Sequence, residues 1–307
     1  MSTSPRVFIA LGTSSQVPTR ERNHNGYFLR WDAQGLLFDP GEGTQRQMIY
    51  ANVSATSITH ILITHFHGDH CLGLAGMLQR LSLDRVPHTV RIFYPASGQT
   101  YFDNLRNASI YHDVARIEVH PISRAGVVHD AGDFVLEAQP LAHTVESWGY
   151  RLREKDSVTM LPDRLRALGV TGADVGRLKR EGSLTRDGKT IALEQVSTTK
   201  RGQSVAFVMD TGVCEGAARL ALDSDLMVCE STYLETEAAE AAARGHLTAA
   251  GAARIARDND AYLLALTHYS QRYQTTEPFA AEAQRIHSRV VALRDGDVLE
   301  VPRRPAH

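Results

Sequence analysis

Four residues that can bind a metal ion lie within six positions of the chain, directly after an apolar run. They are His65, His67, Asp69 and His70 in the stretch "ILITHFHGDH". On an extended backbone, side chains two residues apart point to the same side, so the first two histidines face one way. Gly68 permits a tight turn that brings the last two residues back beside them. Neutral imidazoles with a carboxylate favour zinc over manganese or iron.

This spacing predicts more than one metal ion. A hydrolytic zinc site uses three protein ligands and leaves the fourth position to water, so four ligands in six residues exceed what one ion needs. The remaining ligands are expected where other apolar runs end. The candidates are His143 in "PLAHTVESWGY", Asp210 in "FVMDTG" and His268 in "LTHYSQRY".

The elements that position these residues are predicted strands, each followed by a helical segment. Leu37 and Phe38 belong to one predicted strand, and Thr44 with Gln47 has the spacing of a capping box that would begin the next helix. A second predicted helix starts near Thr248 in "GHLTAAGAARIARDND". This alternation predicts an α/β fold, in which sites gather at the carboxyl ends of strands.

Composition describes a globular chain of 307 residues with a net charge of −2. The chain contains no run of about 18 apolar residues, the length that a membrane helix needs, and its first residues lack the pattern of a secretory signal. Three cysteines are too few for a disulfide framework, so we expect a cytoplasmic protein with reduced thiols.

Charge is distributed unevenly along the chain. Residues 151–202 hold 12 Lys/Arg and 7 Asp/Glu, a local net charge of +5 on a chain whose total is −2. The same segment has the weakest apolar patterning, which favours an inserted arm over a part of the core. A basic arm on an acidic body is a typical binding surface for a polyanion.

The motifs together resemble a known family. "THFHGDH" is typical of the metallo-β-lactamase superfamily. In order and spacing, "LGTSSQVPTRERN", "LLFDPGEGTQRQM", "PLAHTVESWGYR", "MDTG", "CEST", "RGHLT" and "LTHYSQRY" resemble the ribonuclease Z family of tRNA 3′-processing endonucleases. The resemblance extends from about Val7 to Tyr273.

The resemblance implies a fold and a reaction. The fold would be a four-layer αβ/βα sandwich, a single domain over residues 1–307 with a projecting substrate-binding arm at 151–202. The enzyme would use zinc to hydrolyse the phosphodiester that joins the 3′ trailer to precursor tRNA, leaving a 3′-hydroxyl on the tRNA. The family is typically a homodimer. We expect neither a membrane nor DNA as a partner.

The resemblance also implies a ligand set for two zinc ions per subunit, with manganese as the alternative metal. His65, His67 and His143 would hold one ion. Asp69, His70 and His268 would hold the other. Asp210 would bridge the two ions.

Catalytic and substrate-binding roles fall on further residues. Asp69 would orient the attacking water or take its proton. His246 is the candidate that protonates the leaving oxygen, with Glu230 holding its other ring nitrogen. Arg272 is a candidate phosphate clamp. In the arm, the candidates for phosphate contacts are Arg177, Lys179, Arg180, Arg186 and Lys189.

Two other functions fit parts of the pattern. The first is a dinuclear hydrolase of small phosphodiesters or sulfate esters on the same scaffold, which would not need the basic arm. The second is a non-catalytic, zinc-dependent RNA-binding scaffold, which the complete ligand set argues against.

Overall fold

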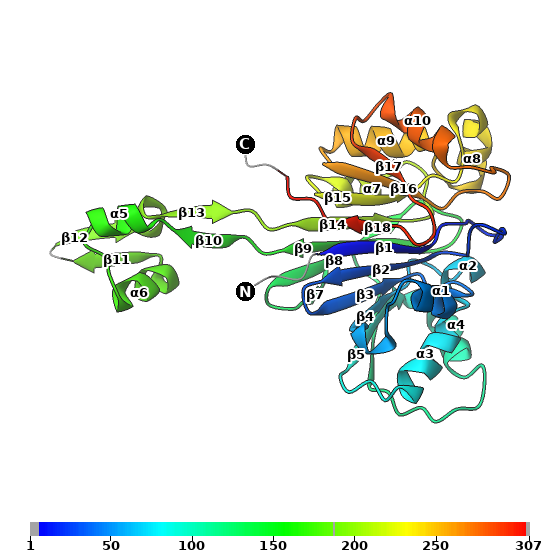
Figure 1. The fold of residues 1–307 in the computed structure, drawn as a ribbon, viewed down its shortest axis with the longest axis horizontal. Helices are drawn as coiled ribbons and strands as arrows, with labels where there is room; N and C mark the ends of the chain where they lie inside the picture. Colours follow the sequence, from blue (N-terminus) through cyan, green and yellow to red (C-terminus); the bar gives the residue numbers. More distant parts are fainter. Residues whose placement is uncertain (1–5, 187, 305–307) are drawn as a thin grey trace.

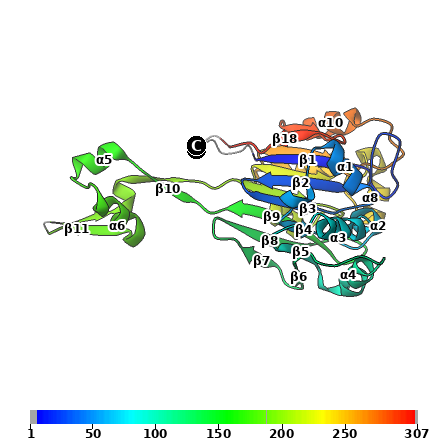
Figure 2. The ribbon, with the colours of Figure 1, turned by 60° about the horizontal axis from the view of Figure 1, so that its bottom comes forward.

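The computed structural model describes residues 6–186 and 188–304 and shows two sheets packed face to face with helices outside (Figure 1). This is the four-layer αβ/βα sandwich that the sequence predicts. An arm leaves one end of the sandwich and points away from it in both views (Figures 1 and 2).

The first sheet has seven strands and is antiparallel on one side and parallel on the other. Its order is β18 (Val298–Glu300), β1 (Val7–Gly12), β2 (Gly26–Trp31), β3 (Gln34–Phe38), β4 (His60–Leu62), β5 (Val90–Pro95) and β6 (Ile117–Ile122). The helices on its outer side are α1 (Thr44–Tyr50), α2 (Gly68–Cys71), α3 (Leu74–Leu83) and α4 (Gln99–Arg106).

The second sheet also has seven strands. Its order is β17 (Val290–Ala292), β16 (Leu263–Thr267), β15 (Leu226–Glu230), β14 (Ser204–Val208), β9 (Ser147–Glu154), β8 (Phe134–Leu141) and β7 (Gly126–Asp130). Strands β17 to β14 are parallel, and β9 to β7 continue the sheet in antiparallel fashion. The helices on this side are α7 (Glu215–Ala221), α8 (Ala238–Arg244), α9 (Ala249–Asp258) and α10 (Glu277–Gln284).

Strand β1 shows why the apolar runs are continuous. Phe8 packs between the two sheets, and Ile9 packs on the other side of its sheet, among the residues of the helical layer. Successive side chains of a strand alternate between its faces, so a sheet covered on both sides needs apolar residues at every position. Between the sheets, Phe38 and Phe207 approach to 4.5 Å between ring centroids. This central layer fixes the two sheets relative to each other.

The arm is a two-stranded stalk with a small tip. Strands β10 (Ser157–Met160) and β13 (Ser197–Lys200) pair along the stalk. The tip is built from α5 (Pro162–Ala167), α6 (Ala173–Glu181), β11 (Ser183–Arg186) and β12 (Lys189–Ala192). It has an apolar cluster of its own, formed by Leu165, Val170, Leu178, Leu184, Ile191 and Val196. Residues 151–154 continue β9, so the projection begins after Glu154; Asp187 lies outside the described residues.

The predicted capping box at the start of α1 is wrong. Gly43 occupies the N-cap position with φ of 84°, and no side chain caps the helix. The Thr44 hydroxyl instead lies 3.4 Å from the Asn25 carbonyl oxygen. The helix near Thr248 is confirmed, because that hydroxyl accepts a hydrogen bond from the Gly251 amide at 2.9 Å and α9 begins at the next residue. Over the described ranges, no helix has the length and apolar character to cross a bilayer.

Candidate metal centre

The polar residues singled out in the sequence meet where strands of both sheets end. His65 and His67 lie in the loop that follows β4, and Asp69 and His70 lie on the short helix α2 that follows this loop. From the second sheet, His143 follows β8, Asp210 follows β14 and His268 follows β16. Residues more than 200 positions apart therefore reach one point, because the two sheets face each other across the core.

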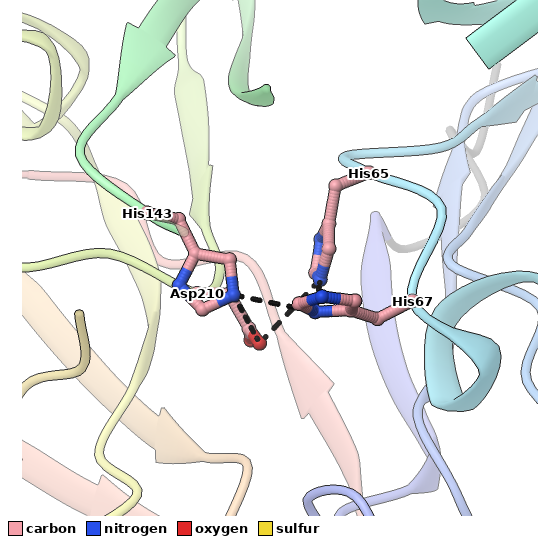
Figure 3. A group of neighbouring side chains, drawn as sticks. All are labelled: His65, His67, His143 and Asp210. Carbon is pink, nitrogen blue, oxygen red and sulfur yellow. Dashed lines mark hydrogen bonds and ion pairs between the residues drawn. The ribbon is translucent and has the colours of Figure 1, made fainter. Parts of the chain in front are cut away.

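The first cluster contains three imidazoles and a carboxylate (Figure 3). His67 Nδ1 lies 3.0 Å from His65 Nε2 and 3.3 Å from His143 Nε2. Asp210 Oδ2 lies 3.6 Å from the first of these Nε2 atoms and 3.7 Å from the second. Ligand atoms that bind one zinc ion tetrahedrally lie roughly 3.4 Å apart, so these four atoms surround a space of the right size.

The second cluster lies on the other side of Asp210. Asp210 Oδ1 is 3.0 Å from His268 Nε2 and 3.3 Å from His70 Nε2. Asp69 Oδ2 is 3.5 Å and 3.3 Å from the same two nitrogens. One carboxylate thus presents a separate oxygen to each cluster, which is the arrangement of a bridging ligand.

Hydrogen bonding and charge both fit a bound cation here. Asp210 Oδ1 and His268 Nε2 are buried and lie 3.0 Å apart, but neither atom makes a hydrogen bond of acceptable geometry within the described residues, which is costly unless something else binds them. Burial alone would lower the pKa of His70, but the carboxylates of Asp210, Asp69 and Asp39 outweigh it and raise this pKa well above its usual value. Three buried carboxylates around one imidazole favour additional positive charge.

Contacts behind the clusters set which ring nitrogen faces the centre. The Nδ1 of His143 donates to the Gly245 carbonyl at 2.9 Å, and the Nδ1 of His70 donates to Asp39 Oδ2 at 2.9 Å. The Nδ1 of His268 donates to the Thr232 hydroxyl at 2.7 Å. With Nδ1 protonated, each Nε2 keeps its lone pair for a metal.

Several of these supporting residues were not identified from the sequence. Asp39 also accepts from the Thr64 hydroxyl at 2.8 Å, and that hydroxyl accepts from His65. The Asn25 amide lies 3.1 Å from His70 Nε2, and its carbonyl oxygen accepts from the Tyr27 hydroxyl. Asp39 could have been identified from the sequence, because it follows an apolar strand as Asp210 does. Asn25 could not, since it lies in an irregular loop.

Three residues at this centre have a strained backbone. Asp39, Asp210 and His268 have φ of 41°, 27° and 63°, in the left-handed region that residues with a Cβ rarely adopt. Each follows a strand, where a positive φ changes the direction of the chain. Strained conformations of this kind cost free energy and persist where the surrounding structure enforces them.

His246 and Glu230 form a pair beside the clusters. The Nδ1 of His246 donates to Glu230 Oε1 at 2.9 Å, and Glu230 is fully buried. Burial alone would lower the pKa of His246, but the charges of Glu230 and Asp210 raise it to about 9. A ring nitrogen of His246 also lies within 4.8 Å of ligand atoms of Asp210 and His268, so the pair borders the space between the clusters.

A cavity of about 770 Å³ opens onto the clusters. Its walls include His67, Asp69, Asp210 and His246. Arg272 lies at its rim, where the guanidinium donates to both carboxylate oxygens of Glu240. The arm candidates are not part of this site, because Arg177, Lys179 and Arg180 lie on α6 at the tip of the arm (Figure 1).

Comparison with known proteins identifies relatives over almost the whole chain. The family model described as the metallo-beta-lactamase superfamily matches residues 19–147. A ribonuclease Z from Nocardia farcinica is 53% identical over 304 residues, which is 98% of this chain and 99% of the relative. A ribonuclease Z from Streptomyces coelicolor is 51% identical over 303 residues, with 98% and 99% covered.

Solved structures agree on the fold. The crystal structure of the short form of human tRNase Z superposes with a TM-score of 0.71 at 25% identity and covers 96% of this chain and 99% of that one. A diphosphatase of the PhnP family, at 15% identity, has a TM-score of 0.65 over 96% of this chain and 97% of its own, and shares the fold alone.

Proposed function

The chain belongs to the ribonuclease Z family of the metallo-β-lactamase superfamily, and we propose that its two clusters hold the two zinc ions with which it removes the 3′ trailer from precursor tRNA. It is a metal-dependent hydrolase that processes tRNA 3′ ends. The observation that carries the proposal is Asp210, whose two oxygens face different clusters at distances from 3.0 to 3.7 Å.

The metal ions and the residues around the clusters have separate roles in the hydrolysis. Two bound zinc ions, with manganese as the alternative, would lower the pKa of water and offset the negative charge that develops on the phosphoryl oxygens. Asp69 lies beside both His70 and His268, lines the cavity and orients the attacking water or takes its proton. The product keeps its 3′-hydroxyl because the bond to the 3′ oxygen is the one that breaks.

The leaving oxygen needs a proton, and His246 is placed to provide it. Its Nδ1 is held by Glu230, so its Nε2 is the nitrogen available to the cavity. The Glu230 carboxylate is itself fixed by the Thr211 amide at 2.9 Å and the Thr232 hydroxyl at 2.7 Å. A histidine whose orientation is set by a buried carboxylate is a typical general acid.

The arm would bind the tRNA body away from the cut. Its tip presents Lys179 and Arg180 in the last turn of α6, close to Arg177. Contacts between such side chains and phosphates position a nucleic acid without reading its sequence. This role explains a basic, separately folded tip on an otherwise acidic chain.

The arm and the metal centre lie at opposite ends of the sandwich, which supports a homodimer. Strand β9 begins at Ser147, near His143, and ends at Glu154, where the arm starts. Its eight residues cover about 26 Å. Strand β14 returns from the arm and ends two residues before Asp210. The arm therefore points away from its own centre (Figure 1), and we propose that it serves the centre of the partner subunit.

The cysteines are in keeping with a reducing compartment. Cys71, Cys214 and Cys229 are all free thiols. We propose that the protein acts in the cytoplasm, where thiols stay reduced and precursor tRNA is present.

The function is tested with purified protein and a precursor tRNA that carries a 3′ trailer. We expect cleavage just past the discriminator nucleotide, a 3′-hydroxyl on the tRNA product, and loss of cleavage when a chelator removes the metal. Mapping both product ends by primer extension and ligation provides the measurement. Trailer removal that is indifferent to the chelator, or a cut at another position, would contradict the proposal.

A further inference from the structure

Arg272 lines the cavity, and the outer edge of its guanidinium is already bound to a carboxylate. Its Nη1 donates to Glu240 Oε2 at 2.9 Å and its Nη2 donates to Glu240 Oε1 at 2.8 Å. Two parallel bonds of this kind use the outer edge of the guanidinium, the edge that would otherwise grip a phosphate. A phosphate clamp at Arg272, as predicted from the sequence, would have to use the Nε side of the guanidinium, whereas the two bonds to Glu240 leave the flat faces of the group unused.

The Glu240 carboxylate is shared between two arginines. Glu240 offsets the charge of Arg272 and also pairs with Arg244, whose Nε lies 3.2 Å from Glu240 Oε1. Two arginines and one carboxylate leave a net charge of +1 at this rim, which attracts RNA, while the bonds to Glu240 fix the orientation of the Arg272 guanidinium.

The flat faces of the guanidinium remain for binding. The guanidinium carbon lies over the ring of Tyr233, 5.0 Å from the ring centroid. Tyr233 is buried, being 4% exposed, whereas the Arg272 side chain is 40% exposed and lines the cavity. The fork to Glu240 and the ring of Tyr233 together hold the guanidinium plane in a fixed orientation.

This plane lies close to the reacting groups. The ring centroids of Tyr233 and His246 are 6.1 Å apart, and His246 borders the clusters. A nucleotide whose phosphate reaches the metal centre can therefore place its base against this part of the rim. Unpaired bases in RNA are commonly bound by stacking on aromatic rings or on arginine planes.

We propose that Arg272, held flat by Glu240 and Tyr233, is a stacking surface for a nucleobase that adjoins the scissile phosphate. The inference rests on the proposed function, since it assumes a single-stranded RNA end in the cavity. It assigns Arg272 a role in positioning the substrate through its planar face. Every base offers such a face, so this contact tolerates different sequences at the cleavage site.

The test combines an arginine variant with a substrate that lacks the base. Precursor tRNAs are made with an abasic residue at the nucleotide immediately before or immediately after the cut, and kcat/KM is measured for each. For the wild-type protein we expect one abasic position to lower kcat/KM about tenfold or more. In Arg272→Ala, which has already lost the stacking partner, the same abasic residue should change kcat/KM less than twofold.

Two further variants separate stacking from charge. Arg272→Lys keeps the charge but loses the plane, so it should behave like Arg272→Ala. Arg244→Ala is a matched control, because this arginine also pairs with Glu240 but covers no aromatic ring in the described structure; it should keep the full abasic penalty. Elemental analysis of every variant establishes that the metal content is unchanged.

The experiment distinguishes a failure of the proposed function from a failure of the stacking proposal. If wild-type protein does not cut the intact precursor, the proposed function is wrong. If it cuts the precursor, but the abasic penalty is equally large in wild type and Arg272→Ala at both positions, or absent from wild type at both, the stacking surface is wrong. A normal rate in Arg272→Lys, combined with sensitivity to an uncharged methylphosphonate at a neighbouring linkage, would restore the phosphate clamp.

Discussion

Asp210 is the residue on which both clusters depend. Replacing it by Ala removes the oxygen that faces each cluster, and the buried imidazoles around it lose the carboxylate that holds them together. We expect Asp210→Ala to contain clearly less zinc per subunit than the wild type, measured by elemental analysis after exhaustive dialysis. Asp258→Ala, a change of an exposed carboxylate on α9, is the control. Unchanged stoichiometry in Asp210→Ala would rule out the bridge.

His246 should affect the rate without affecting the metal. Because Glu230 orients it and neither cluster needs it as a ligand, we expect His246→Ala to retain the wild-type zinc content while trailer cleavage slows by about 10²- to 10⁴-fold. Single-turnover rates across a pH series provide the measurement. A rate equal to that of wild type at every pH would exclude proton donation by His246, and loss of zinc would make it a ligand.

His60 makes the fold sensitive to acid. It is buried between the sheets at 2% exposure, next to His129 and Phe93. Burial, and then the charges of His129, Arg91 and His120, lower its pKa to about 3. A folded-state pKa below the unfolded value means that the unfolded chain takes up the proton first. Stability is therefore retained above pH 6.5 and lost as the pH falls towards 3, by about 2 kcal/mol between pH 6.5 and 5.

His60→Leu should remove this loss. We expect its urea midpoint to fall less between pH 7 and pH 5 than that of wild type, whereas the same substitution at the exposed His112 should leave the wild-type pH dependence in place. If wild type and His60→Leu lose stability in parallel over this interval, another group is responsible.

At the scale of elements, the arm is a separable binding unit because its tip has its own apolar cluster. Replacing Lys179 and Arg180 by Ala on the exposed side of α6 should leave the tip folded, since the buried residue of that helix is Leu178. We expect weaker binding of precursor tRNA and a smaller dependence of log Kd on log salt, by about one to two units of slope.

Filter binding at several salt concentrations measures this effect. The control is Arg219→Ala with Arg257→Ala, an equal loss of charge from exposed positions on α7 and α9 of the body. Hydrolysis of a small chromogenic diester should be the same in all three proteins. A loss of slope as large in the body variant as in the arm variant would show that the effect is due to net charge.

At the scale of the whole molecule, the separation of the arm from its own metal centre predicts that activity on precursor tRNA needs the arm of one subunit and the centre of the other. A subunit without residues 155–200 keeps its centre, and a His67→Ala subunit keeps its arm. Each homodimer should be inactive on precursor tRNA. After unfolding and refolding the two together in equal amounts, we expect roughly a quarter of wild-type activity, because half of the dimers combine one intact centre with the partner's arm. No recovery, in a mixture shown to contain heterodimers, would mean that each arm serves its own centre.

Features of this protein that depend on local spacing could be predicted from the order of its residues. The run from His65 to His70 indicates metal ligands by its residue types and close spacing. The strand and glycine turn predicted for this run are wrong, because β4 ends at Leu62 and Gly68 begins helix α2 without a positive φ. Strand and helix periodicity indicated the α/β layers, and charge counting indicated the arm. The prediction from local spacing was wrong at Thr44, because Gly43, with a left-handed backbone, occupies the N-cap position of α1 in its place.

Features that depend on the order of strands in the two sheets could not be predicted in this way. His143, Asp210 and His268 reach the first loop because their strands lie in a second sheet that faces it, and no spacing along the chain encodes that approach. The same holds for the support of His70 by Asp39 and for the pairing of Arg272 with Glu240. These contacts join residues that lie 31 and 32 positions apart, and the packing of whole elements brings them within hydrogen-bonding distance.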